Sequence, residues 1–509
     1  VQSPLVVTEL SVTSSTVTST STLDATLLTA SSVTWTADGG VTLGAASLSS
    51  TAWTSHSTVS VSGALDVRSS TTVTCTTGSL VSAQSLTISS DSTLTASDTS
   101  SGTLAVSATS LLVDGTVSAG VLSIDASSLT ISSTGQMTGN GVVTCDGTTM
   151  SLAGTLASTT TDVFLTQSSA LTLSGAATVT ASVISVRTAS MQLGGTSSLV
   201  VAGRGSSAST GDGVGAAASS GGGGGGGHGG GGGVGESNSA SNGAVYDSLY
   251  YPVISGSGGG HGDFSGHTKP GGAGGGVVNI TVTGSLTVGS GTSITANGSP
   301  GVGGSNGDSY NNNVAASGGG GGSGGAILVV ASSLLGTGSI EANGGAGGGR
   351  GTNSYNNDNG KYGGGGGGGR IALHLSSSLA PSVTLAAIGG AAGGSGADAA
   401  AAGTIYTDVA SNRTLIIDNT PTTALTNVGT VTVPASGSAT ITLDMLRIVN
   451  SLVSVQSPLV VTELSVTSST VTAVRASQAA VMDISSSTWT MSAPITANNL
   501  TLSSVTWTG

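Results

Sequence analysis

One group of side chains in this chain has the types and spacing that metal binding requires. His261, Asp263 and His267 lie close together in the sequence, and two imidazoles with a carboxylate could hold a zinc-like ion. They stand in a glycine-rich segment, where no predicted strand or helix fixes their geometry. The sequence therefore favours a solvated loop at this point, with no metal site.

Carboxylates are the second group that could do chemistry. Polysaccharide lyases and hydrolases need them clustered on one face of the fold. Here they are dispersed, and most stand beside a predicted corner, where Asp supports a turn through local hydrogen bonds: Asp66, Asp91, Asp114, Asp125 and Asp146. No GxSxG, HExxH or P-loop motif occurs. We therefore expect neither an enzyme nor a cofactor.

Four asparagines stand in acceptor sequons for N-glycosylation: Asn279, Asn297, Asn412 and Asn499. The sequon of Asn297 is weakened by the proline at position 300. Modification needs an exposed asparagine and a secretory route, and O-glycans on outward Ser and Thr are a further expectation. These sites predict a glycosylated protein outside the cell.

Composition limits the elements that could position these groups. Of 509 residues 86 are Gly, and only 6% are charged and 3% aromatic, whereas about 25% charged residues is usual. Such a chain can bury a long, thin core but has few aromatics for a wide one. The net charge of −13 without a basic cluster argues against a nucleic-acid partner. No apolar run is long enough for a membrane span.

Two cysteines are too few for a disulfide framework. Cys75 and Cys145 occur in similar strand-like contexts, TVTC and VVTC. We expect them to be buried or half-buried thiols.

A long repeat is the clearest feature of the sequence. The segment at 1–18 returns identically at 455–472, and SSVTWT at 31–36 matches SSSTWT at 485–490 with the same offset. Chance and strand propensity do not produce so long an identity. The chain is therefore expected to span one large unit, 1–454, and the start of another, within a tandem array or between neighbouring subunits.

A shorter period lies inside this unit. Its apolar positions recur at intervals of 25, 18, 21, 21 and 20: Leu86, Leu111, Leu129, Met150, Leu171 and Met191. Apolar and hydroxyl residues alternate around them, which indicates half-buried strands. The pattern predicts a right-handed parallel β-helix, or β-solenoid, with coils of about 21 residues whose stacked strands shield one core.

Glycine-rich excursions interrupt the second half of this solenoid, at 203–276, 298–325, 344–370 and 389–403. We expect them to leave the coil always at the same corner. They could be flexible tethers, but the regular flanking residues favour extended, polyproline-II-like strands packed side by side. Aromatic side chains on these loops are candidates for contacts with sugars or proteins, against the alternative of solvated tips: Tyr246, Tyr250, Tyr251, Tyr310 and Tyr355.

The predicted organisation has four parts. Ser/Thr-rich coils fill 1–202, coils with glycine-rich insertions fill 203–403, and 404–454 closes the unit. The next copy of the long repeat begins at 455–509.

The pattern GGSGGAILVVASSLLGTGSIEANGGAGGG followed by GGGGGGGRIAL resembles the glycine-rich β-helical repeat proteins of microbial cell surfaces. This resemblance covers roughly 198–405 and implies a large secreted protein. More loosely, a long array of this kind is similar to the shaft of flagellar hairs, or mastigonemes, and this implies a place at a cell surface or on a flagellar appendage. The EGF-type cysteine modules of some such proteins are missing here.

Together these features predict a structural component of an extracellular filament that binds copies of itself, end to end or laterally, and carries glycans. An adhesin that binds glycans or a host surface through its loops is the alternative. A polysaccharide-degrading enzyme and an ice-binding protein are lesser ones. Ice binding would use TxT steps on one face of the solenoid, but TVTST, TVTCT and TLTAS are not expected at one constant position of the coil.

Overall fold

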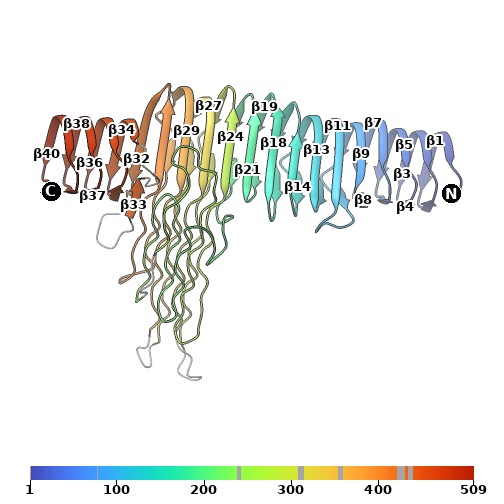
Figure 1. The fold of residues 1–509 in the computed structure, drawn as a ribbon. Helices are drawn as coiled ribbons and strands as arrows, with labels where there is room; N and C mark the ends of the chain where they lie inside the picture. Colours follow the sequence, from blue (N-terminus) through green and yellow to red (C-terminus); the bar gives the residue numbers. More distant parts are fainter. Residues whose placement is uncertain are drawn as a thin grey trace. The chain divides into compact units, whose positions relative to one another are not determined.

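The computed structural model describes residues 2–76, 78–237, 242–307, 315–353, 359–420, 430–433 and 440–508. Strands, turns and extended segments make up this part of the chain, and it contains no helix. No segment there could therefore cross a membrane as a long apolar helix. The predicted β-solenoid is confirmed: parallel strands stack coil upon coil (Figure 1).

Two compact units divide the chain. The first comprises 1–200, 280–293 and 334–338, and the second comprises 201–279, 294–333 and 339–509. Boundaries between the two units fall inside three strands: β24 (Val277–Val282), β26 (Ser293–Thr295) and β27 (Ala326–Gly336).

Each coil of the first unit contributes one short strand to one sheet. Its strands are β2 (Thr16–Ser19), β4 (Thr34–Ala37), β6 (Ala52–Ser55), β8 (Thr72–Cys75), β10 (Thr93–Ala96), β12 (Thr116–Ala119), β14 (Gln136–Gly139), β17 (Thr155–Ser158), β20 (Thr178–Thr180) and β23 (Ser198–Val200). We call this the short-strand sheet.

The rest of each coil forms a second sheet. In the first unit its strands are β1 (Leu5–Thr13), β3 (Leu23–Ser31), β5 (Val41–Ser49), β7 (Val59–Arg68), β9 (Ser79–Ile88), β11 (Thr103–Val113), β13 (Val121–Ile131), β15 (Val143–Asp146), β16 (Thr149–Leu152), β18 (Asp162–Ser168), β19 (Ala170–Leu173), β21 (Val183–Thr188), β22 (Met191–Leu193) and β25 (Ser285–Val288). We call this the long-strand sheet.

The second unit continues the same pattern in β28 (Ser339–Glu341), β29 (Arg370–Leu379), β30 (Thr384–Ala386), β31 (Thr404–Val409), β32 (Asn412–Asp418), β33 (Thr430–Val433), β34 (Ile441–Val449), β35 (Leu452–Val455), β36 (Leu459–Thr467), β37 (Thr470–Ala473), β38 (Ser477–Ser485), β39 (Thr488–Met491), β40 (Ile495–Ser503) and β41 (Thr506–Thr508). Here the short strands β28 and β30 pair with each other, and β33, β35, β37, β39 and β41 form a separate five-stranded sheet.

The register confirms the short period of the sequence. The six apolar positions from Leu86 to Met191 pair in order, each with its predicted neighbour. Coil length, however, is less uniform than the sequence predicted. Near both ends it is 18, as in the series Leu5, Leu23 and Val41 and in the pair Leu459 and Ser477. The longest step, from Leu86 to Leu111, accommodates a turn at 97–102 that Asp98 caps by accepting the amide of Ser100.

Side chains alternate in and out along the short strands, so one face of each lines the core. The nine-residue strands alternate in two halves, with two successive outward residues between the halves, as in β3. Inward residues stack on their equivalents in the next coil. Trp35 lies over Trp53 with ring centroids 5.7 Å apart, and Trp489 lies over Trp507 at 6.0 Å. Since the second pair occupies the place of the first pair in the next copy of the long repeat, the repeat recurs in the core as well as in the sequence.

One ladder departs from the predicted parallel arrangement. Strands β31 and β32 pair antiparallel, with Tyr406 opposite Leu415. Ala410 and Ser411 form the connection, and both have positive φ, at 50° and 68°. Two-residue hairpin turns with φ positive at both positions match the twist of the flanking strands, which explains how two non-glycine residues reverse the chain here.

Candidate functional site

The glycine-rich segments of the second unit pack side by side, as the sequence favoured, and Figure 1 shows them as long extended runs. Runs 221–233, 317–325 and 363–369 are buried. Their backbones form a closed set of hydrogen bonds of 2.8 to 3.0 Å. The donor–acceptor pairs are Gly223–Gly318, Gly226–Gly321, Gly321–Gly364, Gly324–Gly367, Gly364–Gly223 and Gly367–Gly226.

These bonds recur every third residue, the period of polyproline II. The spacing leaves no room for side chains. A Cβ at Gly225 would overlap the carbonyl oxygen of Gly365, and a Cβ at Gly347 would overlap that of Gly363. Glycine is required here for close backbone approach. We call the packed segments the glycine bundle.

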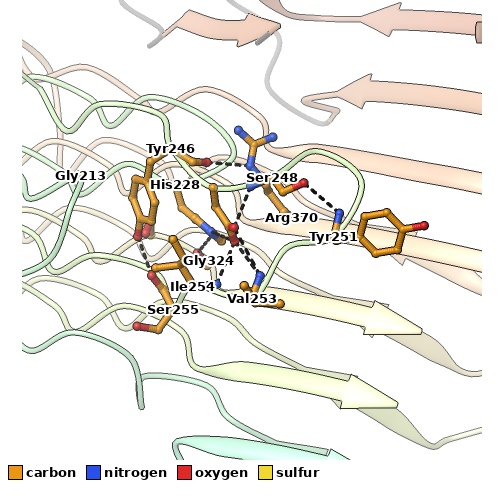
Figure 2. A network of polar contacts seen from close by, with 12 residues as sticks. Gly213, His228, Tyr246, Ser248, Tyr251, Val253, Ile254, Ser255, Gly324 and Arg370 are labelled. Atoms are coloured by element: carbon orange, nitrogen blue, oxygen red, sulfur yellow. Dashed lines mark hydrogen bonds and ion pairs between the residues drawn. The ribbon is translucent and has the colours of Figure 1, made fainter. Parts of the chain in front are cut away.

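A buried polar centre ties this bundle to its own strands (Figure 2). The side chain of His228 is fully buried, with Nδ1 3.0 Å from the carbonyl oxygen of Gly324 and Nε2 3.2 Å from Oδ2 of Asp247. The Asp247 carboxylate also accepts the backbone amides of Val253 and Ile254, both at 3.0 Å. Asp247 thus holds the segment 247–254 in a closed turn.

Arg370, at the start of β29, lies in the same centre. Its Nε donates to the carbonyl oxygen of Tyr246 at 2.8 Å, and another guanidinium nitrogen donates to Oγ1 of Thr404 at 2.9 Å. The Tyr246 hydroxyl donates to the carbonyl oxygen of Ser255 at 2.6 Å, and Ser257 donates to that hydroxyl at 2.8 Å. Every partner comes from the second unit.

Burial and hydrogen bonding shift the pKa values of His228 and Asp247 in opposite directions. Burial lowers the pKa of His228, and the hydrogen bond to Asp247 opposes that shift. At Asp247 burial alone raises the pKa, but the hydrogen bonds from His228, Ile254 and Ser248 outweigh it and lower the pKa. Burial also lowers the pKa of Arg370 to about 10. The Asp247 carboxylate therefore stays ionised, with the charge of the Arg370 guanidinium nearby.

The arrangement has the residue types of an acid–base site but is closed. The side chains of His228 and Asp247 are 0% and 2% exposed, so neither can reach a substrate in this structure. Each imidazole nitrogen already faces an oxygen acceptor. The geometry is that of a clamp on the glycine bundle. Sequence reasoning missed it, because His228 stands alone in a glycine run with no local motif.

The predicted tyrosine contacts are only partly available. Tyr246 is held in the polar centre by its hydroxyl, and Tyr250 is half-buried against Tyr406, with ring centroids 4.8 Å apart. Tyr251 is 57% exposed and stacks on His374 at 4.5 Å with the ring planes 5° apart. Tyr310 and Tyr355 lie outside the described residues.

The sequons differ in exposure. Asn412 and Asn499 are exposed, whereas Asn279 and Asn297 are half-buried. Asn297 is also engaged, since its Oδ1 accepts the amide of Asn343 at 2.7 Å. The structure therefore leaves Asn412 and Asn499 as the accessible acceptors.

The remaining polar candidates do not assemble. Asp263 caps its own turn, accepting Gly266 and Thr268, and within the described ranges no three His, Cys, Asp or Glu side chains gather at one point to hold a metal ion. Cys75 and Cys145 are buried free thiols, and burial raises the pKa of each to about 12.

The interpretation of the TxT steps was wrong. They occupy one constant position of the coil, the short-strand sheet. Thr16 pairs with Thr34, and Thr18 with Thr36, and the register continues through every short strand of the first unit. The variable coil length, with inserted turn residues between the steps, hides this alignment in the sequence.

Comparisons with protein families, curated proteins and solved structures found no match for this chain.

Proposed function

We propose that this protein is a structural repeat of an extracellular filament or surface fibre, of the mastigoneme-like kind, without catalytic activity. The observation that carries the proposal is the join between two copies of the long repeat. Strand β34 closes one copy and β36 opens the next, and they pair in parallel from Ile441↔Leu459 to Val449↔Thr467. The ladder crosses the repeat boundary without a break.

The identical sequences also take identical places in the coil. LVVTELSVT forms a nine-residue strand both as β1 and as β36, and each is followed by a short strand, β2 or β37. Any further copy could therefore stack as β36 stacks on β34. Because every added coil covers the open edge of the previous one, such an array would extend by about 4.8 Å per coil.

Two features support a place outside the cell. Asn412 and Asn499 are exposed in sequon context, and the outward surface is rich in hydroxyls and poor in charge. Glycans on these positions would keep a largely uncharged fibre soluble. The buried state of His228 and Asp247 favours a structural role over catalysis.

Electron microscopy of the purified protein tests this proposal. We expect unbranched fibres, or rods whose length doubles when a second copy of residues 1–454 is fused after the first. Compact particles of unchanged length would overturn the filament.

An adhesin remains the second candidate, because Tyr251 presents an exposed ring on a fixed base, His374. Aromatic faces of this kind bind sugars and proteins. Binding to a glycan panel that is lost in Tyr251→Ala, with no fibres under the microscope, would favour the adhesin.

A further inference from the structure

The outward side of the short-strand sheet in the first unit carries two parallel rows of hydroxyl side chains. We call it the threonine face. The first row is Thr16, Thr34, Ala52, Thr72, Thr93, Thr116, Gln136, Thr155, Thr178 and Ser198. The second row is Thr18, Thr36, Thr54, Thr74, Thr95, Ser118, Thr138, Ala157, Thr180 and Val200.

Most of these positions are Thr, seven in each row of ten, and none is charged or aromatic. All the side chains of both rows are exposed or half-exposed. The second unit repeats the motif in β37, β39 and β41 as TVTA, TWTM and TWT, with Thr at both outward positions of each strand. The face thus returns in the next copy of the long repeat, whereas β28, with Glu341, and β35, with Leu452, depart from it.

The core does not impose this pattern. Between the two rows stands one inward residue per strand, and its type varies freely among Val, Trp, Leu and Met: Val17, Trp35, Trp53, Val73, Leu94, Val117, Met137, Leu156, Val179 and Leu199. A fold constraint alone would restrict the inward residues and leave the outward ones free. Here the outward residues are uniform.

Strand propensity does not impose it either. Thr favours strands, but this holds equally for the long-strand sheet of the same coils. There threonine is less regular: one outward row has Glu9, Leu27 and Ala45, and another has Ser11, Thr29, Ser47, Asp66 and Thr87. Two adjacent rows made mostly of threonine occur on the short-strand sheet, which points to something outside the protein that this face meets.

The spacing of the rows fits a partner with a lattice. Neighbouring strands place equivalent hydroxyls about 4.8 Å apart, and alternate residues within a strand are about 6.7 Å apart. Thr is stiff at χ1, so each side chain holds its methyl and hydroxyl in a fixed direction. Both distances are close to oxygen repeat distances on the surfaces of hexagonal ice, and a mixed methyl and hydroxyl surface can hold water in that order.

We propose that the threonine face binds crystalline ice. A crystalline polysaccharide fits less well, because such surfaces are held by flat aromatic rings and the rows contain none. The open stretch runs from β2 to β10. Beyond it the turn at 97–102 reaches toward β12 and β14, where Asn140 donates to the carbonyl oxygen of Ser100 at 3.1 Å. The proposal does not depend on the filament.

Ice adsorption of the full chain, expressed without glycosylation, tests it. The variant Thr34→Tyr places a bulky side chain on the face, and Thr29→Tyr places the same change on the long-strand sheet of the same coil, where Thr29 is also exposed. We expect measurable thermal hysteresis and uptake into growing ice for the wild type. Thr34→Tyr should lose more than half of both, and Thr29→Tyr should retain them. Circular dichroism confirms that both variants fold.

Several results would overturn the proposal. Folded wild-type protein without hysteresis would do so, as would equal losses in the two variants. If the wild type is retained on microcrystalline cellulose or chitin and Thr34→Tyr alone abolishes this, the face binds a polysaccharide. If Thr34→Tyr alone abolishes lateral dimerisation, the face binds a second copy of the chain. Fibres under the microscope without ice binding would overturn this proposal and still support the filament proposal, so the two are tested separately.

Discussion

Serine occupies a left-handed backbone position at one corner of successive coils. Ser14, Ser32 and Ser50 have φ between 48° and 55°, and their counterparts in the next copy of the long repeat, Ser468 and Ser486, have φ of 49°. The amide of Ser32 donates to the carbonyl oxygen of Ser49 in the next coil at 3.0 Å. Each corner is therefore fixed by the stack at the expense of a conformation that L-residues disfavour.

This strain predicts a stabilising substitution. Ser32→Gly removes a penalty of about 1–2 kcal/mol and adds about 0.5–1 kcal/mol of unfolded-state entropy, so we expect a higher unfolding midpoint. Ser32→Val should lower it, because branched residues are outliers at positive φ. In Ser47→Gly, within β5, only the entropy loss applies, so the midpoint should fall. Thermal unfolding compares the three, and a lower midpoint for Ser32→Gly would contradict the corner geometry.

At the scale of the element, the glycine bundle shows how a chain without side chains can be ordered. Isolated glycine runs lose more entropy on ordering than any others. Here each extended segment is hydrogen-bonded to neighbours on several sides, and the His228–Asp247–Arg370 centre clamps it to β29. Order comes from the whole set of contacts and from no single residue.

A pair of glycines two positions apart tests this packing. A Cβ at Gly347 would overlap the carbonyl oxygen of Gly363, whereas a Cβ at Gly349 meets nothing within 4 Å. We expect Gly347→Ala to open the bundle and to increase the rate of amide hydrogen exchange at 363–369 by at least tenfold. This factor corresponds to about 1.4 kcal/mol in the free energy of opening. Gly349→Ala should leave exchange there unchanged. Equal behaviour of the two variants would mean that the segments are not packed.

The coil itself is a removable element if the stack is regular. Deleting residues 459–476 takes out one whole coil, since Leu459 pairs with Ser477, and brings equivalent positions back into register. We expect this variant to keep the β-sheet circular dichroism of the wild type. Deleting only 459–467 removes half a coil and misaligns the inward residues, so it should lower the unfolding midpoint. Similar midpoints for the two deletions would argue against the register.

How much of this could be predicted differs between local and distant features. The apolar series from Leu86 to Met191 predicted the stacking correctly, because inward positions must recur once per coil. The threonine rows escaped prediction, since insertions such as the turn at 97–102 change the coil length between steps. The His228 centre joins residues that are far apart in the sequence, such as Tyr246 and Arg370. No local sequence pattern predicts such contacts.

At the scale of the whole molecule, the decisive feature is the passage from one copy of the long repeat to the next. The structure shows β34, β36, β38 and β40 in one parallel ladder, in which the first residues of the four strands pair in order and the step from coil to coil stays constant. Identical residues begin both copies, so the same ladder can continue for as many copies as a chain contains.

Cryo-electron microscopy of a protein with two complete copies in tandem measures this most directly. We predict one uninterrupted stack of coils, with strands about 4.8 Å apart on both sides of the boundary and Trp35, Trp53 and their counterparts at the same place in their coils. A gap or a change of axis at the boundary, or density for separate globular bodies, would contradict it.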